Sequence, residues 1–313
     1  MSVLERLQSV FVALAALLGL AAGIALPIGA AVGSIVLPAL LLMITAVFLQ
    51  MDAAQVRAAR DTKKLVAVSL VINFMWTPLF AWMLGAGLLG GAPDLRIGLL
   101  LLLVTPCTDW YLVFTALARG HLGGAAALLP INLVLQLLLL PVYVLLLGGE
   151  AAMIGVGPLF EAIVLVLAAP LVVAVVLRWL TAGSARGRTL TNSASRAILP
   201  LLYLAVFAMF AWQGRVVADH GGELLLLLIP LGLFFVVTPL IARMAGSLSA
   251  LPDDQRVTLT MTTVARNSPI ALALAVAAFP DRPLIAVALV IGPLVELPVL
   301  ALLSQLVRRP VRA

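Results

Sequence analysis

The sequence predicts an all-α integral membrane protein that crosses the bilayer with ten helices. Of its 313 residues, 64% are hydrophobic and 10% are charged, against about 45–50% and about 25% in a typical soluble domain. Ten apolar runs approach the roughly 20 residues that a helix needs to cross the hydrocarbon core. Most charged residues stand in the short segments between these runs, so the net charge of +6 reports membrane orientation and does not indicate a nucleic-acid-binding protein.

The ten predicted spans follow one another through short connections, so no soluble domain is expected. They cover residues 9–29, 33–50, 66–90, 96–118, 123–147, 157–180, 197–217, 223–245, 256–279 and 283–307. A turn at 29–33 separates the first two spans, 280–283 separates the last two, and the longest connection is 181–195. Glu5 and Arg6 precede the first apolar run without a small-residue cleavage site, which favours a first span over a removable signal peptide.

The basic residues predict which side of the membrane each connection faces. An even number of spans puts both termini on the same side, and that side collects 15 of the 19 Lys and Arg residues. The opposite side has Arg96, Arg215 and Arg282, while Arg266 falls inside a span. By the positive-inside rule, we expect a multi-pass protein of the plasma (inner) membrane with both termini in the cytoplasm.

The two halves of the sequence match each other when one is shifted by 160 residues. PINLVLQLLLLPV (130–142) then falls on VIGPLVELPVLAL (290–302), and TPCTD (105–109) falls on ARNSP (265–269). Each half has five spans, an odd number, so the second half must be inserted upside down. We therefore expect two inverted five-helix repeats, residues 1–147 and 157–308, within a single transmembrane domain.

Spans four and nine each carry a polar, proline-bearing interruption. Pro106 removes a backbone N–H and disfavours the α conformation at Thr105, and Pro269 is its counterpart in the second half. Backbone groups freed in this way are tolerated at membrane depth only against protein or a water-filled cavity. A single proline would indicate a packing kink, but two paired breaks in an inverted repeat indicate a transport site near the midplane.

Three charged residues fall inside the predicted spans: Asp109, Arg266 and Glu296. Each costs roughly 2.5–3.5 kcal/mol on insertion scales, so they must be paired or hydrated. Their charges leave one negative charge in excess, and a proton on Glu296 or Asp109 would neutralise it, which favours a proton-coupled site. Two structural interpretations stay open, a static Asp109–Arg266 ion pair and a structural hydrogen bond from Glu296 to a neighbouring helix.

Polar side chains accompany these charges. Cys107, the only cysteine, is either an inert small filler or a thiol activated by the neighbouring helix end. The other polar residues of the two breaks are Thr108, Asn267 and Ser268. Asn132 and Gln136 stand four residues apart on one helix face, and we expect them to line the cavity together with Asn73. One cysteine and two distant histidines indicate neither a disulfide nor a metal site, and no cofactor is expected.

Three motifs resemble the bile acid–sodium symporter superfamily, and within it the arsenite-efflux permease branch. They are TPCTDWYLVFTALARG (105–120), ARNSPIALALAVAAF (265–279) and IGPLVELPVL (291–300). The resemblance implies a panel domain and a core domain, with helices four and nine discontinuous and crossing in the core, and alternating access by movement of one domain against the other. It also implies that Cys107 and Glu296 are the transport residues.

The resemblance bears on the coupling ion as well. Sodium-coupled relatives carry an acidic residue and a glutamine in the first part of the ninth-helix break, where this chain has Thr262 and Arg266. Sodium needs oxygen ligands, and a guanidinium offers none. Arg266 can instead take the place of a bound sodium ion as a fixed positive charge, which favours protons over sodium as the coupling ion.

These observations predict a secondary active transporter that exports arsenite or a related small oxyacid in exchange for protons. Trivalent arsenic is soft and favours thiolate. The alternative is a sodium- or proton-coupled symporter of a small organic anion whose carboxylate pairs with Arg266. An intramembrane enzyme built on Asp253 and Asp254 is disfavoured because no second aspartate-rich motif accompanies them. The expected partners are the small-molecule substrate, protons and membrane lipid, and no nucleic acid.

Overall fold

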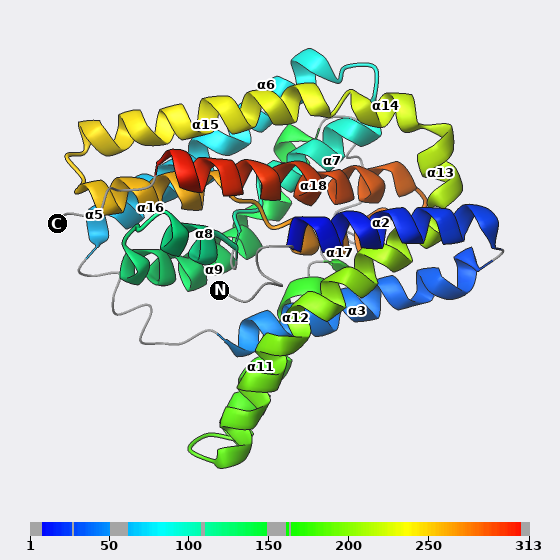
Figure 1. Ribbon diagram of the computed structural model, residues 1–313, viewed down its shortest axis with the longest axis horizontal. Coiled ribbons are helices and arrows are strands. Elements are labelled where there is room, and N and C mark those ends of the chain that lie inside the picture. The colour runs from blue at the N-terminus through cyan, green and yellow to red at the C-terminus, as the bar shows by residue number, and fades with distance from the viewer. Residues whose placement is uncertain are drawn as a thin grey trace. The chain divides into compact units, whose positions relative to one another are not determined.

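The computed structural model describes residues 8–26, 28–50, 62–107, 110–148, 161–162 and 164–307 of the chain. Within these ranges the protein is all-helical, with no β-strand and with one isolated bridge between Pro106 and Arg266 (Figure 1). The helices are α2 (Gln8–Ala25), α3 (Gly29–Leu49), α5 (Lys63–Val71), η1 (Ile72–Trp76), α6 (Thr77–Leu88), α7 (Pro93–Leu103), α8 (Trp110–Leu117), α9 (Leu122–Leu147), η3 (Val164–Ala168), α11 (Ala169–Leu180), α12 (Ala185–Trp212), α13 (Gly214–Asp219), α14 (Gly221–Leu225), α15 (Leu228–Leu248), α16 (Asp253–Val264), α17 (Ser268–Ala278) and α18 (Pro283–Leu306).

Each of the ten predicted spans contains helix in the structure, but the spans are built in different ways. Five described helices are long and apolar enough to cross a membrane alone, and α9, which bends by 52° after Gln136, makes a sixth. Pro141 accounts for this bend, because its ring excludes the carbonyl of Leu137 one turn earlier. The protein is therefore a helical, multi-pass membrane protein.

The predicted connection at 181–195 is wrong, since α12 already begins at Ala185. Ser184 caps this helix: its side-chain oxygen accepts the N–H of Gly187 at 3.1 Å. The segment is polar (ARGRTLTNSAS), and polarity ends an apolar run without ending a helix. The helix therefore continues beyond its apolar part.

Compact packing divides the chain into two units, each with helices from both halves of the sequence. The first contains α2, α3, η3, α11, α12, α13, α14 and α17 with the beginning of α18. In it, α12 packs along both α2 and α3 (Figure 1). Gly19 and Gly23 of α2 allow this close approach, because a Cβ at either would collide with the carbonyl oxygen of Phe207 or Ala211 in α12.

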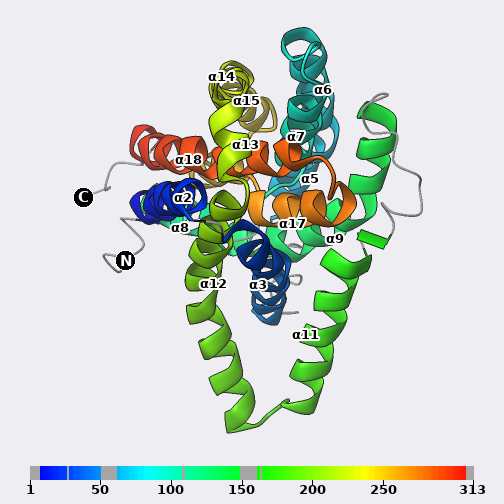
Figure 2. The same ribbon diagram turned by 90° about the vertical axis from the view of Figure 1, so that its right-hand side faces the viewer.

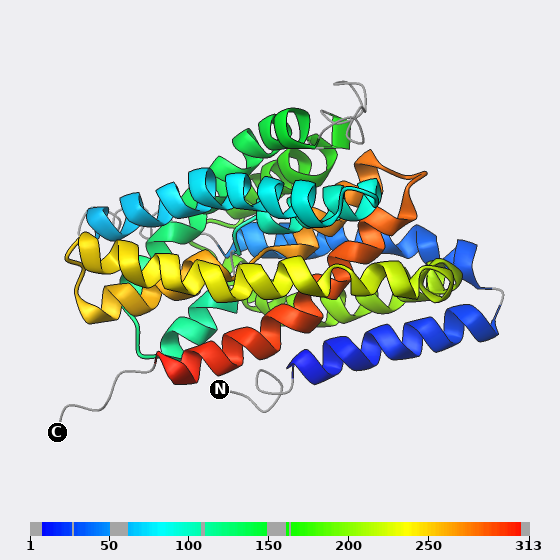
Figure 3. The same ribbon diagram turned by 90° about the horizontal axis from the view of Figure 1, so that it is seen from above.

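The second unit contains α5, η1, α6, α7, α8, α9, α15, α16 and the end of α18. The α15 and α16 helices lie side by side (Figure 3). A small core from α5, η1, α15 and α16 joins Leu65, Ile72, Ala242, Leu251 and Leu259. The predicted repeat boundaries do not coincide with the two units, and the repeats themselves stay a prediction.

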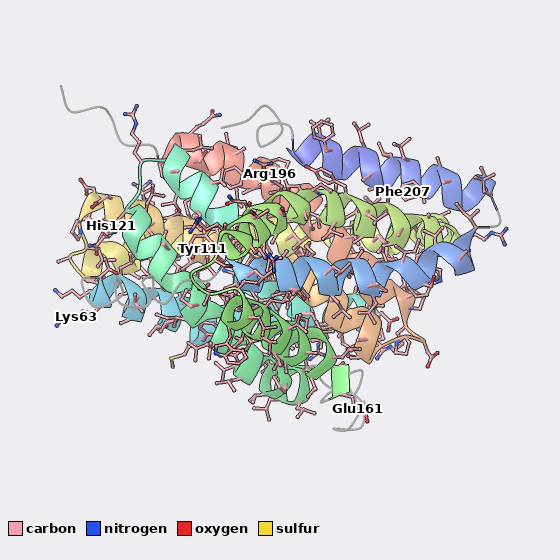
Figure 4. The ribbon with its side chains drawn as sticks, turned by 90° about the horizontal axis from the view of Figure 1, so that it is seen from below. Lys63, Tyr111, His121, Glu161, Arg196 and Phe207 are labelled. Carbon is pink, nitrogen blue, oxygen red and sulfur yellow. The ribbon has the colours of Figure 1, made fainter. Side chains whose placement is uncertain are left out.

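A π-helical turn, η1, interrupts the third span just before Pro78. Proline has no N–H to donate to the carbonyl of Phe74 four residues earlier. The hydroxyl of Tyr143 in α9 donates to that carbonyl instead, at 2.6 Å. A second tyrosine fastens α8 to α9: the Tyr111 hydroxyl donates to the carbonyl of Ala125 at 2.6 Å (Figure 4). The first contact satisfies a carbonyl that Pro78 leaves without its α-helical donor, and the second joins α8 to α9.

The two acids of the enzyme alternative have a structural role in the fold. Asp253 and Asp254 form the first turn of α16, where negative charge complements the helix dipole. Asp253 also lies 3.6 Å from Arg256 in an exposed ion pair.

Candidate functional site

The two predicted helix breaks exist in the second unit, and they pair with each other. The α7 helix ends at Leu103 and α16 ends at Val264, after which Ala265 is extended with ψ 137°. The N–H of Cys107 donates to the carbonyl of Ala265 at 3.0 Å, and the N–H of Asn267 donates to the carbonyl of Thr105 at 2.7 Å. Each break therefore satisfies backbone groups of the other, as unpaired groups at membrane depth require.

Pro106 lies inside the first break, and its missing N–H is compensated locally. The Thr105 hydroxyl lies 2.9 Å from the carbonyl of Leu101 and 3.1 Å from that of Leu102, the group that residue 106 would otherwise serve. Pro269 differs from its predicted role. It is the second residue of α17, a position where proline is tolerated, and the second break lies before it, at 265–267.

Arg266 is the centre of the site. Its side chain is 1% exposed, and Nη1 donates to the carbonyl of Leu103 at 2.8 Å. Nη2 donates to Asn73 Oδ1 at 2.9 Å and to the carbonyl of Thr263. Nε donates to the carbonyl of Val264 at 3.4 Å. The guanidinium carbon also lies 5.2 Å from the ring centre of Phe234. The cation is thus surrounded by oxygens and an aromatic face.

The oxygens around Arg266 explain how a buried cation is held there. Leu103 is the last residue of α7, and Thr263 and Val264 are the last two of α16. Terminal carbonyls of a helix have no intrahelical donors, and they form the negative end of its dipole. Two helix C-termini therefore meet the guanidinium, and their carbonyls offset part of the cost of its desolvation.

Asn73 connects this cation to the π-helical turn η1. It is fully buried, and its Nδ2 donates to Ser69 Oγ at 3.3 Å and to the carbonyl of Thr262 at 3.5 Å. Ser69 Oγ in turn lies 3.3 Å from Thr262 Oγ1. Sequence reasoning assigned Asn73 only to a cavity wall, although its spacing of four from Ser69 indicated a shared polar face.

Glu296 meets the break through the backbone. Its side chain is 2% exposed, and Oε1 accepts the N–H of Arg266 at 2.8 Å. The guanidinium of the same residue donates to the carbonyls and to Asn73 instead. Glu296 therefore binds the backbone of Arg266, and its carboxylate is not hydrogen-bonded to the guanidinium of that residue.

The remaining break residues are buried in the same unit. Cys107 is 1% exposed, Asn267 is 5% exposed and Ser268 is 4% exposed. The hydroxyl of Ser268 has no hydrogen-bond partner within the described residues. Thr108 and Asp109 lie outside the described residues, and with them the predicted Asp109–Arg266 pair.

Asn132 and Gln136 form a second polar group on α9. Both are fully buried, and among the described residues neither the amide nitrogen nor the amide oxygen of either side chain has a hydrogen-bond partner. An unpaired buried polar group costs about 1–3 kcal/mol. The α9 helix packs against α7, α8 and α16, the helices that flank the breaks. Four uncompensated polar atoms next to a helix crossing are typical of a group kept for a ligand.

The sequence of the chain is similar to those of several known proteins. The family profile of the sodium bile acid symporters matches residues 37–220. The chain is 28% identical over 255 residues to the arsenical-resistance protein Acr3 of Corynebacterium glutamicum, covering 76% of this chain and 68% of that protein. It is 24% identical over 246 residues to the uncharacterised protein YbaS of Bacillus subtilis, covering 77% and 78%. It is 23% identical over 343 residues to an uncharacterised transporter of Synechocystis, covering 99% and 89%.

The family match extends over more than half of the chain. It includes the motif at 105–120, and it agrees with the multi-pass helical fold. The chain belongs to the sodium bile acid symporter family of membrane transporters.

Proposed function

We propose that the protein is a secondary active transporter of the plasma membrane that exports arsenite, or a related small oxyacid, in exchange for protons. One observation carries the proposal: Cys107 and Glu296 are anchored to consecutive residues of one break. The backbone N–H of Cys107 donates to the carbonyl of Ala265, and Oε1 of Glu296 accepts the backbone N–H of Arg266. A soft thiol and a proton-binding acid at the same helix crossing suit an arsenic-containing acid. The similarity to an arsenical-resistance protein supports this substrate.

The single thiol suits transport better than tight capture. Trivalent arsenic prefers thiolate ligands, and Cys107 is the only cysteine of the chain. One sulfur ligand gives weak, reversible binding, so the substrate can leave the site again. Asn132 and Gln136 add amide donors and acceptors suited to hydroxyl groups.

The surroundings of Arg266 support protons over sodium as the coupling ion. The carbonyls of Leu103, Thr263 and Val264 and the Asn73 oxygen make up an oxygen shell that could serve a hard cation. The guanidinium uses this shell itself. Glu296 accepts one backbone N–H and is the acid we assign to proton binding.

The same contacts weigh against the organic-anion alternative. Four of the five N–H groups of the Arg266 guanidinium already donate to protein oxygens. A substrate carboxylate would have to displace them before it could pair with Arg266. The amides of Asn132 and Gln136 would then be its main donors.

We further propose that the two units act as the panel and core domains of an alternating-access transporter. The second unit contains both breaks and every described site residue except Pro269. Each unit draws helices from both halves of the sequence, as expected when two inverted repeats each contribute to both domains.

Arsenite uptake into everted membrane vesicles tests the proposal. We expect uptake that a protonophore abolishes, that a sodium gradient leaves unchanged, and that falls to background in Cys107→Ser and in Glu296→Gln. Glu223→Gln, which makes the same change at an exposed acid of α14, should transport normally. Full uptake in Cys107→Ser would mean that the thiol does not bind the substrate, and no uptake by the unaltered protein would remove arsenite as the substrate. Uptake driven by sodium would overturn the coupling, and thermal stabilisation by organic acids but not by arsenite would favour the organic anion.

A further inference from the structure

The turn between α11 and α12 in the first unit borders an open pocket of about 470 Å³. The two helices converge at this turn (Figure 2). Its polar lining consists of Arg178, Thr181, Ser184, Arg188, Thr191 and Asn192. None of these residues belongs to the helix breaks, so the proposed transport function leaves the pocket unexplained.

The local backbone fixes the shape of this pocket. Ser184 donates to the carbonyl of Thr181 at 2.7 Å and accepts the N–H of Gly187 at 3.1 Å, which fixes the start of α12. Gly183 has φ 70°, a conformation that glycine adopts without strain. Gly187 has no room for a side chain, because its Cβ would overlap the carbonyl oxygen of Thr181. The hollow is therefore a built feature of the turn.

The charge around the pocket is entirely positive. Residues 178–196 include Arg178, Arg186, Arg188 and Arg196 and contain no acid. In the part of the chain that the structure describes, no ion pair joins Arg178 or Arg188 to a carboxylate. Arg186 and Arg188 lie in the first turn of α12, where positive charge is unfavourable with the helix dipole. An anion in the pocket would relieve this repulsion.

The neighbouring side chains indicate that the pocket lies at the depth of lipid headgroups. Val172, Val173 and Val176 of α11 are exposed, as expected for a helix face in contact with lipid. The helix ends with Trp179, which is 76% exposed, and Leu180. An exposed tryptophan and arginines at the end of an apolar helix are typical of the membrane–water interface.

We propose that this pocket binds the phosphate group of an anionic phospholipid, with Arg178 and Arg188 on the phosphate oxygens and the hydroxyls of Thr181 and Thr191 nearby. Arginine pairs with phosphate through two parallel N–H donors, and basic pockets between membrane helices bind anionic headgroups. Such a lipid would brace α11 against α12 where the two helices meet.

The purified full-length protein in dodecyl maltoside, titrated with phosphatidylglycerol, tests this site. We expect saturable thermal stabilisation by phosphatidylglycerol and none by phosphatidylcholine at the same concentrations. Arg178→Gln/Arg188→Gln should weaken the apparent affinity by about tenfold or more, because it removes both charged donors from the phosphate. The matched control is Arg186→Gln/Arg196→Gln, which removes the same charge from exposed positions of α12 outside the pocket and should change the affinity less than about threefold.

Three results would overturn the proposal. An equal loss of affinity in the control pair would mean diffuse surface electrostatics in place of a pocket. Stabilisation by inorganic phosphate alone, lost in Arg178→Gln/Arg188→Gln, would mean a free-phosphate site. Equal stabilisation by phosphatidylcholine would mean that the pocket does not distinguish an anionic headgroup from a zwitterionic one. Unchanged thermal stability of both variants without lipid would show that neither substitution acts by unfolding the protein.

Discussion

At the scale of single residues, Arg266 shows how the structure accommodates a charge in the membrane. Its carbonyl partners come from the ends of two helices about 160 residues apart in the sequence, and its aromatic partner Phe234 comes from a third. The sequence predicted that Arg266 lies at a helix break with Glu296 in the same site. It could not predict the carbonyl oxygens around Arg266, because every residue has a main-chain carbonyl and the residue type does not indicate which ones bind a side chain.

The buried amides of α9 give the sharpest prediction at this scale. Asn132→Leu and Gln136→Leu should each raise the free energy of unfolding by about 1 kcal/mol or more, because each removes unpaired buried polar atoms. Both should abolish arsenite uptake in proteoliposomes. Unfolding in detergent micelles measures the first effect, and uptake measures the second.

Asn73→Leu is the matched control for these amides. Its side chain is also fully buried but is hydrogen-bonded to Arg266 and Ser69. Its loss should therefore lower the free energy of unfolding by about 1–3 kcal/mol. If Asn132→Leu and Gln136→Leu destabilise the protein and leave uptake intact, the two amides have a structural role and do not bind substrate.

At the scale of helices, the apolar runs predicted where helix lies more reliably than where it ends. The α9 helix covers 122–147 against a prediction of 123–147, and α18 covers 283–306 against 283–307. The start of α12 was missed by twelve residues, because a helix can leave the membrane without ending. The π-helical turn η1 was not predicted either, since Pro78 alone does not indicate which group donates to the carbonyl of Phe74.

The contact between η1 and α9 can be tested with a pair of tyrosines. Tyr143→Phe removes the hydroxyl that satisfies the Phe74 carbonyl and should lower the free energy of unfolding by about 0.6–1.7 kcal/mol, the range for hydrogen bonds between membrane helices. Tyr203→Phe is the control, because the Tyr203 hydroxyl is buried without a partner in the described part of the chain, and its removal should cost nothing. Equal effects of the two substitutions in micelle unfolding would show that the Tyr143 bond does not join these elements.

At the scale of the whole molecule, two of the ten predicted spans are each built from a pair of short helices. The α7 and α8 helices have 11 and 8 residues, and α16 and α17 have 12 and 11. None reaches the roughly 20 residues of a complete span. The predicted fourth and ninth spans each need two such helices. The polar interruptions that predicted the site also divide these spans into helices too short to be recognised as spans by their length.

The ten-span, inverted topology predicts which connections face the cytoplasm. In a Cys107→Ser background, Gly91→Cys and Gly222→Cys should react with a membrane-impermeant maleimide in intact cells. A Cβ at either position meets no atom within 4 Å, so the substitutions should not disturb the fold. Ala182→Cys and Ser249→Cys follow the sixth and eighth predicted spans and should react only in everted vesicles. The positive-inside rule predicts this pattern, because basic residues gather beside Ala182 and Ser249.

Labelling of Ala182→Cys and Gly222→Cys from the same side would mean that the seventh span does not cross the membrane. The second repeat would then not be an inverted copy of the first.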